Sequence, residues 1–201
     1  MIEAKVRVRV GEFILDAEVQ GSGVMCIVGK NGAGKTTLIR AMAGFLPIDD
    51  GMVKVGGRDV TNEPVGKRGV VLVTPSTFIP HLRVDSHLTW GAMMKGLKPS
   101  GQHVKEVKSC LGINFDGVVG SLSRGMRQRV ALATALLSAP KAILVDEAFL
   151  GLDDREAFMS AYGRLTKEEA IDMAFSSQDE AEGKLADRTY VLDGGRAALK
   201  H

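Results

Sequence analysis

One stretch of the sequence decides the fold: it reads Gly29-Lys30-Asn31-Gly32-Ala33-Gly34-Lys35-Thr36 and fits the pattern G-x-x-x-x-G-K-[ST]. The apolar run before it, Val24 to Val28, is typical of a strand covered on both faces. A helix is expected to follow over Lys35 to Ala43. The glycines let backbone N–H groups turn inward around phosphate oxygens, at the positive end of that helix. The stretch therefore predicts a phosphate-binding loop between a buried strand and a helix.

Side chains of this loop have predicted roles in binding ATP and Mg²⁺. Lys35 is expected to reach the β- and γ-phosphates and to act in catalysis, and the Thr36 hydroxyl is expected to ligate Mg²⁺. The other loop residues expected to hold the nucleotide are Gly29, Asn31, Gly32, Ala33, Gly34 and Thr37.

A second apolar run, Ala142 to Val145, ends in two acidic residues, Asp146 and Glu147. In a parallel sheet such residues emerge at the carboxyl ends of the strands, where ligands bind. Asp146 is expected to hold Mg²⁺ through water, and Glu147 is expected to polarise the water that attacks the γ-phosphate.

The whole chain indicates one α/β domain over residues 1–201. It has 45% hydrophobic and 25% charged residues, as a soluble globular protein has. Strands are expected to alternate with helices, which predicts a mainly parallel sheet. Two alternating strands, Lys5 to Val10 and Phe13 to Val19, are expected at its edge. A helix is expected over Asp179 to Ala186.

Charge and hydropathy exclude several classes of function. The formal net charge of +2 does not indicate a nucleic-acid partner, and no clustered Lys/Arg face with interleaved aromatics is found. No apolar run reaches the roughly 20 residues of a membrane-spanning helix, and the first residues do not form an apolar signal region. A cytoplasmic location is expected.

Four further segments carry a resemblance to a known family. The stretch SLSRGMRQRVALA, residues 121–133, resembles the LSGGQ signature of ABC ATPases, the nucleotide-binding subunits of ABC transporters. LGLD at 150–153 resembles their D-loop, LADR at 185–188 their closing segment, and FIPHLRV at 78–84 the stretch after their Q-loop. The resemblance implies a P-loop NTPase fold: a RecA-like parallel core, an antiparallel β edge and a helical subdomain inserted at about residues 76–137.

The resemblance also implies partners. Two ATPase subunits face each other head to tail, as a homodimer or heterodimer, so Ser123 and Gly125 are expected to meet the nucleotide of the partner subunit. A separate transmembrane permease is expected at the inner face of the cell membrane, and segments such as GEFILDAEV look most like oxyanion importers of the molybdate and tungstate type. Phe13 is expected either to stack on adenine or to be an ordinary core residue.

Three positions depart from the family pattern. Thr74 stands where the Q-loop glutamine is expected, and it keeps a hydroxyl near the metal. Ser177 stands at the position of the switch histidine and is expected to take its catalytic place, since no histidine occurs between His103 and His201. The signature carries Arg124 for its first glycine and Met126 for its glutamine. Because Ser177 is shorter and uncharged, slow ATP hydrolysis is expected.

Three functions were weighed. The first is the ATP-hydrolysing subunit of an importer that energises a separate permease. The second is a soluble ABC-type ATPase without a transport role, acting as a nucleotide-gated clamp or regulator, which the altered Q-loop position favours. The third, a nucleotide kinase, is disfavoured by the signature stretch and by the pair Asp146 and Glu147.

Overall fold

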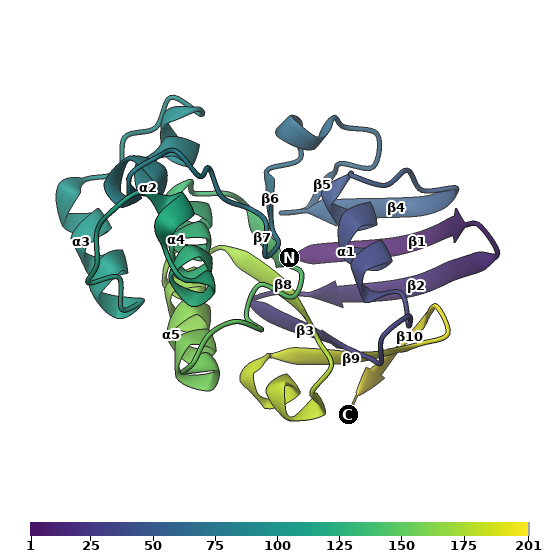
Figure 1. The fold of residues 1–201 in the computed structure, drawn as a ribbon. Helices are drawn as coiled ribbons and strands as arrows, with labels where there is room; N and C mark the ends of the chain where they lie inside the picture. Colours follow the sequence, from purple (N-terminus) through teal and green to yellow (C-terminus); the bar gives the residue numbers. More distant parts are fainter. Residues whose placement is uncertain (201) are drawn as a thin grey trace.

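A six-stranded sheet holds the phosphate-binding loop in the computed structural model, which describes residues 1–200 (Figure 1). Its strand order is β10-β9-β3-β8-β7-β6, parallel throughout except for β10. In that order the strands are β10 (Arg196–Lys200), β9 (Arg188–Asp193), β3 (Val24–Val28), β8 (Asp172–Ser177), β7 (Ala142–Val145) and β6 (Val70–Val73). All five residues of β3 are buried, because a strand lies on each side of it and both its faces are covered.

A second, antiparallel sheet has the order β2-β1-β4-β5. It consists of β2 (Phe13–Gly21), β1 (Ile2–Val10), β4 (Asp50–Val55) and β5 (Arg58–Asp59). The opening strands were expected at the edge of the parallel sheet, and the structure differs: they form this separate sheet, in which β1 pairs with both β2 and β4. Buried and exposed residues alternate along β1 and β2, which suits a sheet with one solvated face. The two sheets approach each other where Asp16 N donates to Gly195 O at 2.8 Å.

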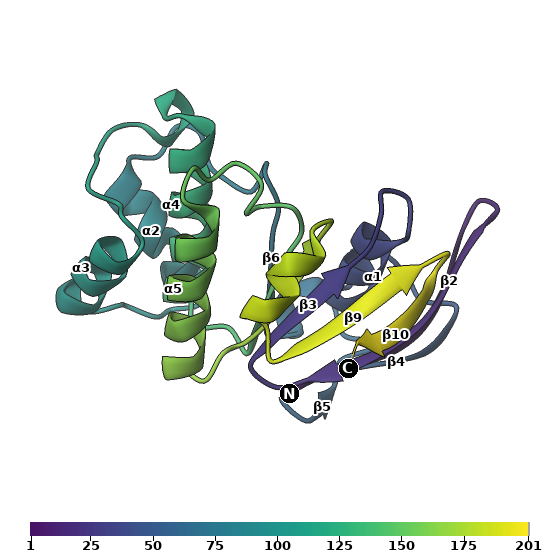
Figure 2. The same cartoon turned by 90° about the horizontal axis from the view of Figure 1, so that it is seen from below.

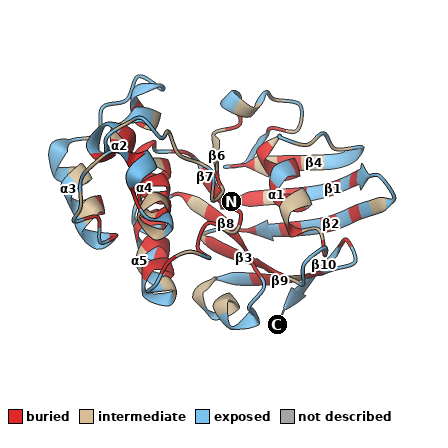
Figure 3. Cartoon of the chain, viewed as in Figure 1, coloured by how far each residue is buried: buried red, intermediate tan, exposed pale blue. Residues whose placement is uncertain are grey.

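Helix α1 (Lys35–Ala43) lies between the two sheets, and its buried Leu38, Ile39 and Met42 join a core with the inner faces of both. The opposite face of the parallel sheet is covered by α4 (Arg124–Leu137) and α5 (Arg155–Glu168), whose buried sides face the strands (Figure 3). Four aromatic rings pack together in this second core: Phe149, Phe158, Tyr162 and Phe175.

Helices α2 (Val84–Met93), α3 (Gly101–Cys110) and α4 follow one another between residues 76 and 137, where a helical region was expected. Figures 1 and 2 place them at the end of the molecule opposite the β1–β2 hairpin. Each helix of residues 1–200 is too short or too polar to cross a membrane.

The helix expected over 179–186 is present as a 3₁₀ helix, η3 (Glu180–Leu185). It begins where the Asp179 carboxylate accepts a hydrogen bond from Ala181 N at 2.8 Å. Near its end, Gly183 packs closely on Thr189 of β9, with the Thr189 hydroxyl donating to Gly183 O at 3.0 Å. Strands β5 and β10 and two short 3₁₀ helices, Val65–Lys67 and Val119–Ser121, were not predicted.

Candidate nucleotide-binding site

The phosphate-binding loop runs from the end of β3 to the first turn of α1. Gly34 is the N-cap residue of that helix and has φ of 106°, in the left-handed region. A Cβ atom at Gly34 would lie 2.9 Å from Cζ of Phe13, so a side chain there would meet both backbone strain and a clash. The half-buried Phe13 thus packs against the loop and also contacts the core. Its two expected roles, stacking on adenine and packing in the core, are therefore compatible.

A recess of about 180 Å³ opens above this loop. It is lined by Phe13, Asn31, Gly32, Gly34, Lys35, Thr36, Thr37 and Glu147. Eight of the predicted site residues, from three separate parts of the chain, are therefore brought together. Ala33 is buried behind the recess, where its carbonyl accepts from Gly195 N at 3.1 Å.

The Lys35 side chain folds back across the loop. Its Nζ donates to Gly29 O at 2.6 Å and to Lys30 O at 2.9 Å. Burial lowers the pKa of the Lys35 ammonium, while the nearby Glu147 and then Asp146 carboxylates oppose that shift. The ammonium is therefore a positioned donor held among carbonyl oxygens, at the place where phosphate oxygens of a nucleotide would compete for it.

Oxygen ligands for a cation lie beside the recess. Thr36 Oγ1 is 3.3 Å from Asp146 Oδ1, and Ser176 Oγ donates to the same carboxylate oxygen at 2.8 Å. No cluster of three or more His, Cys, Asp or Glu side chains suited to a metal occurs within residues 1–200. One hydroxyl and one carboxylate suit Mg²⁺, which takes few protein ligands and completes its shell with water and substrate phosphates.

Ser176 was not predicted as part of the site. It lies on β8, next to β7 in the sheet, and its hydroxyl also accepts a hydrogen bond from Glu147 N at 3.1 Å. The sequence signal for it is the mostly apolar stretch over 171–175, which is typical of a buried strand; in a parallel sheet the residue after such a strand lies at the same edge as Asp146 and Glu147. Ser176 thereby fixes both acidic residues that follow β7.

Glu147 has a φ of 58°, in the left-handed region that non-glycine residues rarely adopt. Such a conformation costs about 1–3 kcal/mol and persists only where the surroundings enforce it. Here the Asp146 N bond to Val73 O (2.8 Å) and the Ser176 contact hold the backbone in place. The turn brings the Glu147 carboxylate to the recess, next to Lys35.

Two residues at altered family positions have their hydroxyls engaged elsewhere. Thr74 Oγ1 lies 3.1 Å from Ser76 Oγ and 3.0 Å from Thr77 Oγ1, within a turn after β6. Within residues 1–200 no hydrogen bond joins it to Thr36 or Asp146. Ser177 Oγ donates to Glu182 Oε2 at 2.7 Å, and its hydroxyl is buried at the end of β8.

The signature-like stretch lies apart from the recess. Ser123 is the N-cap of α4, where its Oγ accepts from Met126 N at 3.2 Å. A Cβ at Gly125 would lie 2.8 Å from Gly151 O, so glycine allows the 150–153 loop to pack on the helix. The exposed Arg124 extends beside Gly151. Neither Ser123 nor Gly125 lines the recess of the same chain.

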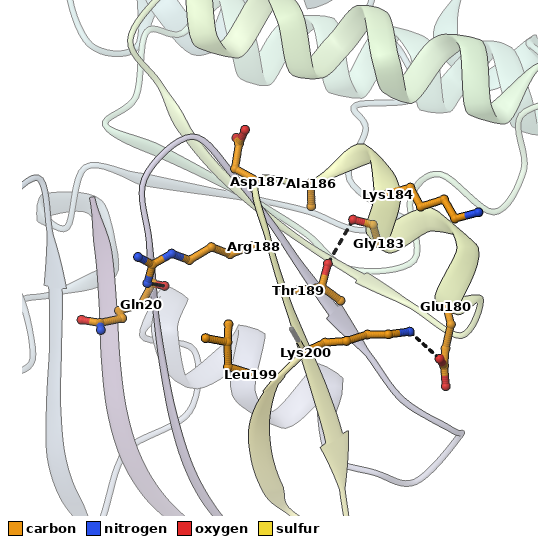
Figure 4. A pocket seen from close by; sticks show the side chains of 10 residues that line it. All are labelled: Gln20, Glu180, Gly183, Lys184, Ala186, Asp187, Arg188, Thr189, Leu199 and Lys200. Carbon is orange, nitrogen blue, oxygen red and sulfur yellow. Dashed lines mark hydrogen bonds and ion pairs between the residues drawn. The ribbon is translucent and has the colours of Figure 1, made fainter.

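A larger hollow of about 710 Å³ lies between η3, β9 and β10 (Figure 4). Its charged groups are largely paired, since Lys200 Nζ contacts Glu180 Oε2 at 2.6 Å and Lys167 Nζ contacts Asp187 Oδ1 at 2.7 Å. It has no glycine-rich loop at a helix N-terminus. The glycine-rich loop at a helix N-terminus and the Lys35 ammonium, groups suited to binding phosphate, lie at the smaller recess instead.

Known proteins are similar to this chain over most of its length. The family model described as "ABC transporter" matches residues 14–150. The chain is 35% identical over 208 residues to the molybdenum import ATP-binding protein ModC of Rhizobium meliloti (strain 1021), covering 97% of this chain. It is 36% identical over 199 residues to the Fe(3+) ions import ATP-binding protein FbpC of Streptomyces avermitilis, covering 94% of this chain. The chain spans 58% of the length of each of these two relatives.

Solved structures show the same fold. A structure of an ATP binding subunit of an ABC transporter matches with a TM-score of 0.81 and 23% identity, covering 100% of this chain and 89% of the other. The ATP-binding cassette MJ0796, a dimer in a post-hydrolysis state bound to ADP and Pi, matches with a TM-score of 0.79 and 20% identity, covering 100% and 98%. The expected fold class, a P-loop NTPase of the ABC ATPase type, is confirmed.

Proposed function

The chain belongs to the ABC transporter family of ATP-binding domains, and from this premise we propose that it binds and hydrolyses Mg-ATP as one of two paired ATPase subunits. The observation that carries the proposal is the convergence of Lys35, Thr36 and Glu147 on one recess, with Asp146 hydrogen-bonded beside it. These groups supply a phosphate-binding cation, metal ligands and a carboxylate at the γ-phosphate end.

The residues divide the reaction among them. The loop N–H groups and Lys35 bind the phosphates, and Lys35 exchanges its carbonyl partners for β- and γ-phosphate oxygens. Thr36 and Asp146 would hold Mg²⁺, which offsets phosphate charge when bound. Glu147 accepts a hydrogen bond from the attacking water. Phe13, at the rim of the recess, provides a ring on which adenine can stack.

The second subunit supplies the residues that cover the nucleotide from the open side of the recess. Ser123 and Gly125 stand at the N-terminus of α4, away from the recess of their own chain. In the head-to-tail pair they cover the nucleotide of the partner, where the helix N-terminus faces the γ-phosphate. MJ0796, which shares the fold, is a dimer bound to ADP and Pi, and this supports the pairing of two subunits.

We place a separate transmembrane permease at an apolar groove of about 570 Å³ beside Thr74, between β6, α2 and α4. Trp90 and Met94 border it and are 44% and 69% exposed. This position puts the chain at the inner face of the cell membrane. The likeness to a molybdenum importer subunit supports an oxyanion as the transported solute. The alternative, a soluble nucleotide-gated clamp or regulator, is favoured by Thr74, whose hydroxyl stays within its own turn.

The test is a hydrolysis and assembly assay on the full chain. Wild type is expected to release phosphate from ATP only with Mg²⁺, and Glu147→Gln is expected to accumulate an ATP-bound dimer, seen as a doubled mass in light scattering. Phosphate release by Glu147→Gln at the wild-type rate would refute the assignment. Co-expression with permease chains encoded beside it separates the two alternatives, because only the importer subunit copurifies with one.

A further inference from the structure

Three consecutive polar residues lie at the end of β8 and just after it, beside the catalytic carboxylate: Ser176 and Ser177 are the last two residues of the strand, and Gln178 follows them. All three line a narrow recess together with Lys35, Glu147 and Leu150. The narrow recess itself has no room for a water, but it adjoins the phosphate-binding recess through the shared Lys35 and Glu147, and that recess is where the γ-phosphate and the attacking water would meet. Any side chain that holds that water from β8 has to be one of these three.

Both serine hydroxyls already have protein partners. Ser176 Oγ donates to Asp146 Oδ1 at 2.8 Å and accepts from Glu147 N at 3.1 Å. Ser177 Oγ donates to Glu182 Oε2 at 2.7 Å and accepts from Asp179 N at 2.9 Å. A hydroxyl has a single proton to donate, so neither serine can donate to a phosphate oxygen without giving up a buried bond.

The hydrogen bond from Ser177 to the Glu182 carboxylate is a strong one. Its side chain is only 11% exposed, and its other oxygen forms an ion pair with Arg155 at the start of α5. Hydrogen bonds to charged groups are stronger than those between neutral groups. Ser177 is therefore held toward η3.

Gln178 is the one of the three whose side chain is not held by a hydrogen bond within residues 1–200. Its side chain is exposed, and within residues 1–200 its amide has no hydrogen-bond partner. Gln178 follows β8 directly and lines the narrow recess together with Glu147 and Lys35. An amide both accepts and donates hydrogen bonds, so one group can contact a water and a phosphate oxygen together.

We propose that Gln178, and not Ser177, is the catalytic residue that takes the place of the family's switch histidine. Its Oε1 accepts a hydrogen bond from the attacking water, and its Nε2 donates to a γ-phosphate oxygen. The water oxygen bonds to phosphorus, the bond from phosphorus to the bridging oxygen breaks with its electron pair going to ADP, and a water proton passes to Glu147. A glutamine holds the water in this way in P-loop GTPases. The proposal rests on the proposed ATP hydrolysis.

The experiment compares Gln178→Ala with Ser177→Ala and with a matched control, Gln102→Ala. Gln102 is an exposed glutamine of α3, and its amide bonds only Glu106, at 2.8 Å. Steady-state phosphate release and the Kd for Mg-ATP are measured for each full chain, with circular dichroism as the check on folding. We expect kcat of Gln178→Ala to fall about 100-fold, as when one donor to a transition-state oxygen is removed. Its Kd should stay within about threefold, and Gln102→Ala should match wild type.

A second measurement separates catalysis from structure. ADP with aluminium fluoride imitates the transferring phosphoryl group, and ADP with beryllium fluoride imitates the ground state. Gln178→Ala should weaken only the aluminium fluoride complex. The proposal is overturned if Gln178→Ala keeps wild-type kcat, if its ATP affinity falls as much as its kcat, or if Ser177→Ala loses more. If wild type itself fails to hydrolyse ATP, the proposed function fails first and this role falls with it.

Discussion

Replacing Lys35 by methionine tests the phosphate-binding loop most directly. Methionine keeps most of the length of the side chain and removes its charge. In the wild type, Nζ has to leave Gly29 O and Lys30 O to reach the β- and γ-phosphates, so binding exchanges two acceptors for two others. Only the difference between a carbonyl and a phosphate acceptor counts toward affinity.

The size of the effect follows from that exchange. A bond from the Lys35 ammonium to a carbonyl has one charged partner, whereas a bond to a phosphate oxygen has two. One charged partner strengthens a hydrogen bond by about 1–1.5 kcal/mol, and we expect each exchange of carbonyl for phosphate to gain about the same. Two such contacts give about 3 kcal/mol, and a tenfold change in Kd corresponds to about 1.4 kcal/mol. We expect Lys35→Met to weaken Mg-ATP binding about 100-fold.

Calorimetric titration of Mg-ATP measures this loss, and Lys30→Met is the control. Lys30 belongs to the same loop and carries the same charge, but its side chain is exposed and only its backbone carbonyl contacts Lys35. Lys30→Met should bind within about threefold of wild type. Equal losses in the two variants would show that general charge, rather than the placement of Lys35, attracts the nucleotide. Unchanged binding by Lys35→Met would refute the site.

Two further predictions concern stability. Gln128 is 2% exposed, and within residues 1–200 neither polar atom of its amide has a hydrogen-bond partner. Gln128→Met should therefore raise the free energy of unfolding by about 1 kcal/mol in urea titrations, and a lower midpoint would show that the amide does form a stabilising hydrogen bond. Burial lowers the pKa of His87 below its ordinary 6.5, so the unfolded chain takes up that proton first and stability should fall as pH drops below about 6.5. His87→Gln should flatten that part of the pH profile, and identical profiles would contradict this origin.

Much of the fold could be predicted where a local pattern was strong enough. The bounds of β3, α1 and β7 match the prediction residue for residue. Each is an apolar run or a stretch of helical periodicity that is followed at once by a residue that ends the element, such as Gly44. Strand β10 was missed because Ala197 and Ala198 give little alternation, although the Gly194-Gly195 turn before it was visible. Which strands pair with β1 is not encoded locally, so the second sheet was not foreseen.

The candidate site also has residues that could be predicted from the sequence and one that could not. The placement of Lys35, Thr36 and Glu147 around one recess follows from two strand ends that point the same way, which the sequence does show. The part played by Ser176 depends on β8 lying beside β7, and that order is a property of the whole sheet. A residue whose role is to position another is therefore harder to find from sequence than one that carries the charge itself.

Ser177 shows why a position in a motif does not determine a role. Its alignment with the family's histidine is a statement about order along the chain, whereas its chemistry depends on where its one proton goes. Glu182, five residues later, is brought within 2.7 Å by the 3₁₀ helix η3, and Arg155 holds that carboxylate from another helix. Because the Ser177 hydroxyl already donates its proton to Glu182, the neighbouring Gln178 is the residue that can contact the water. Restoring a histidine at 177 would therefore also break the Glu182 bond, and its effect on turnover would be the sum of both changes.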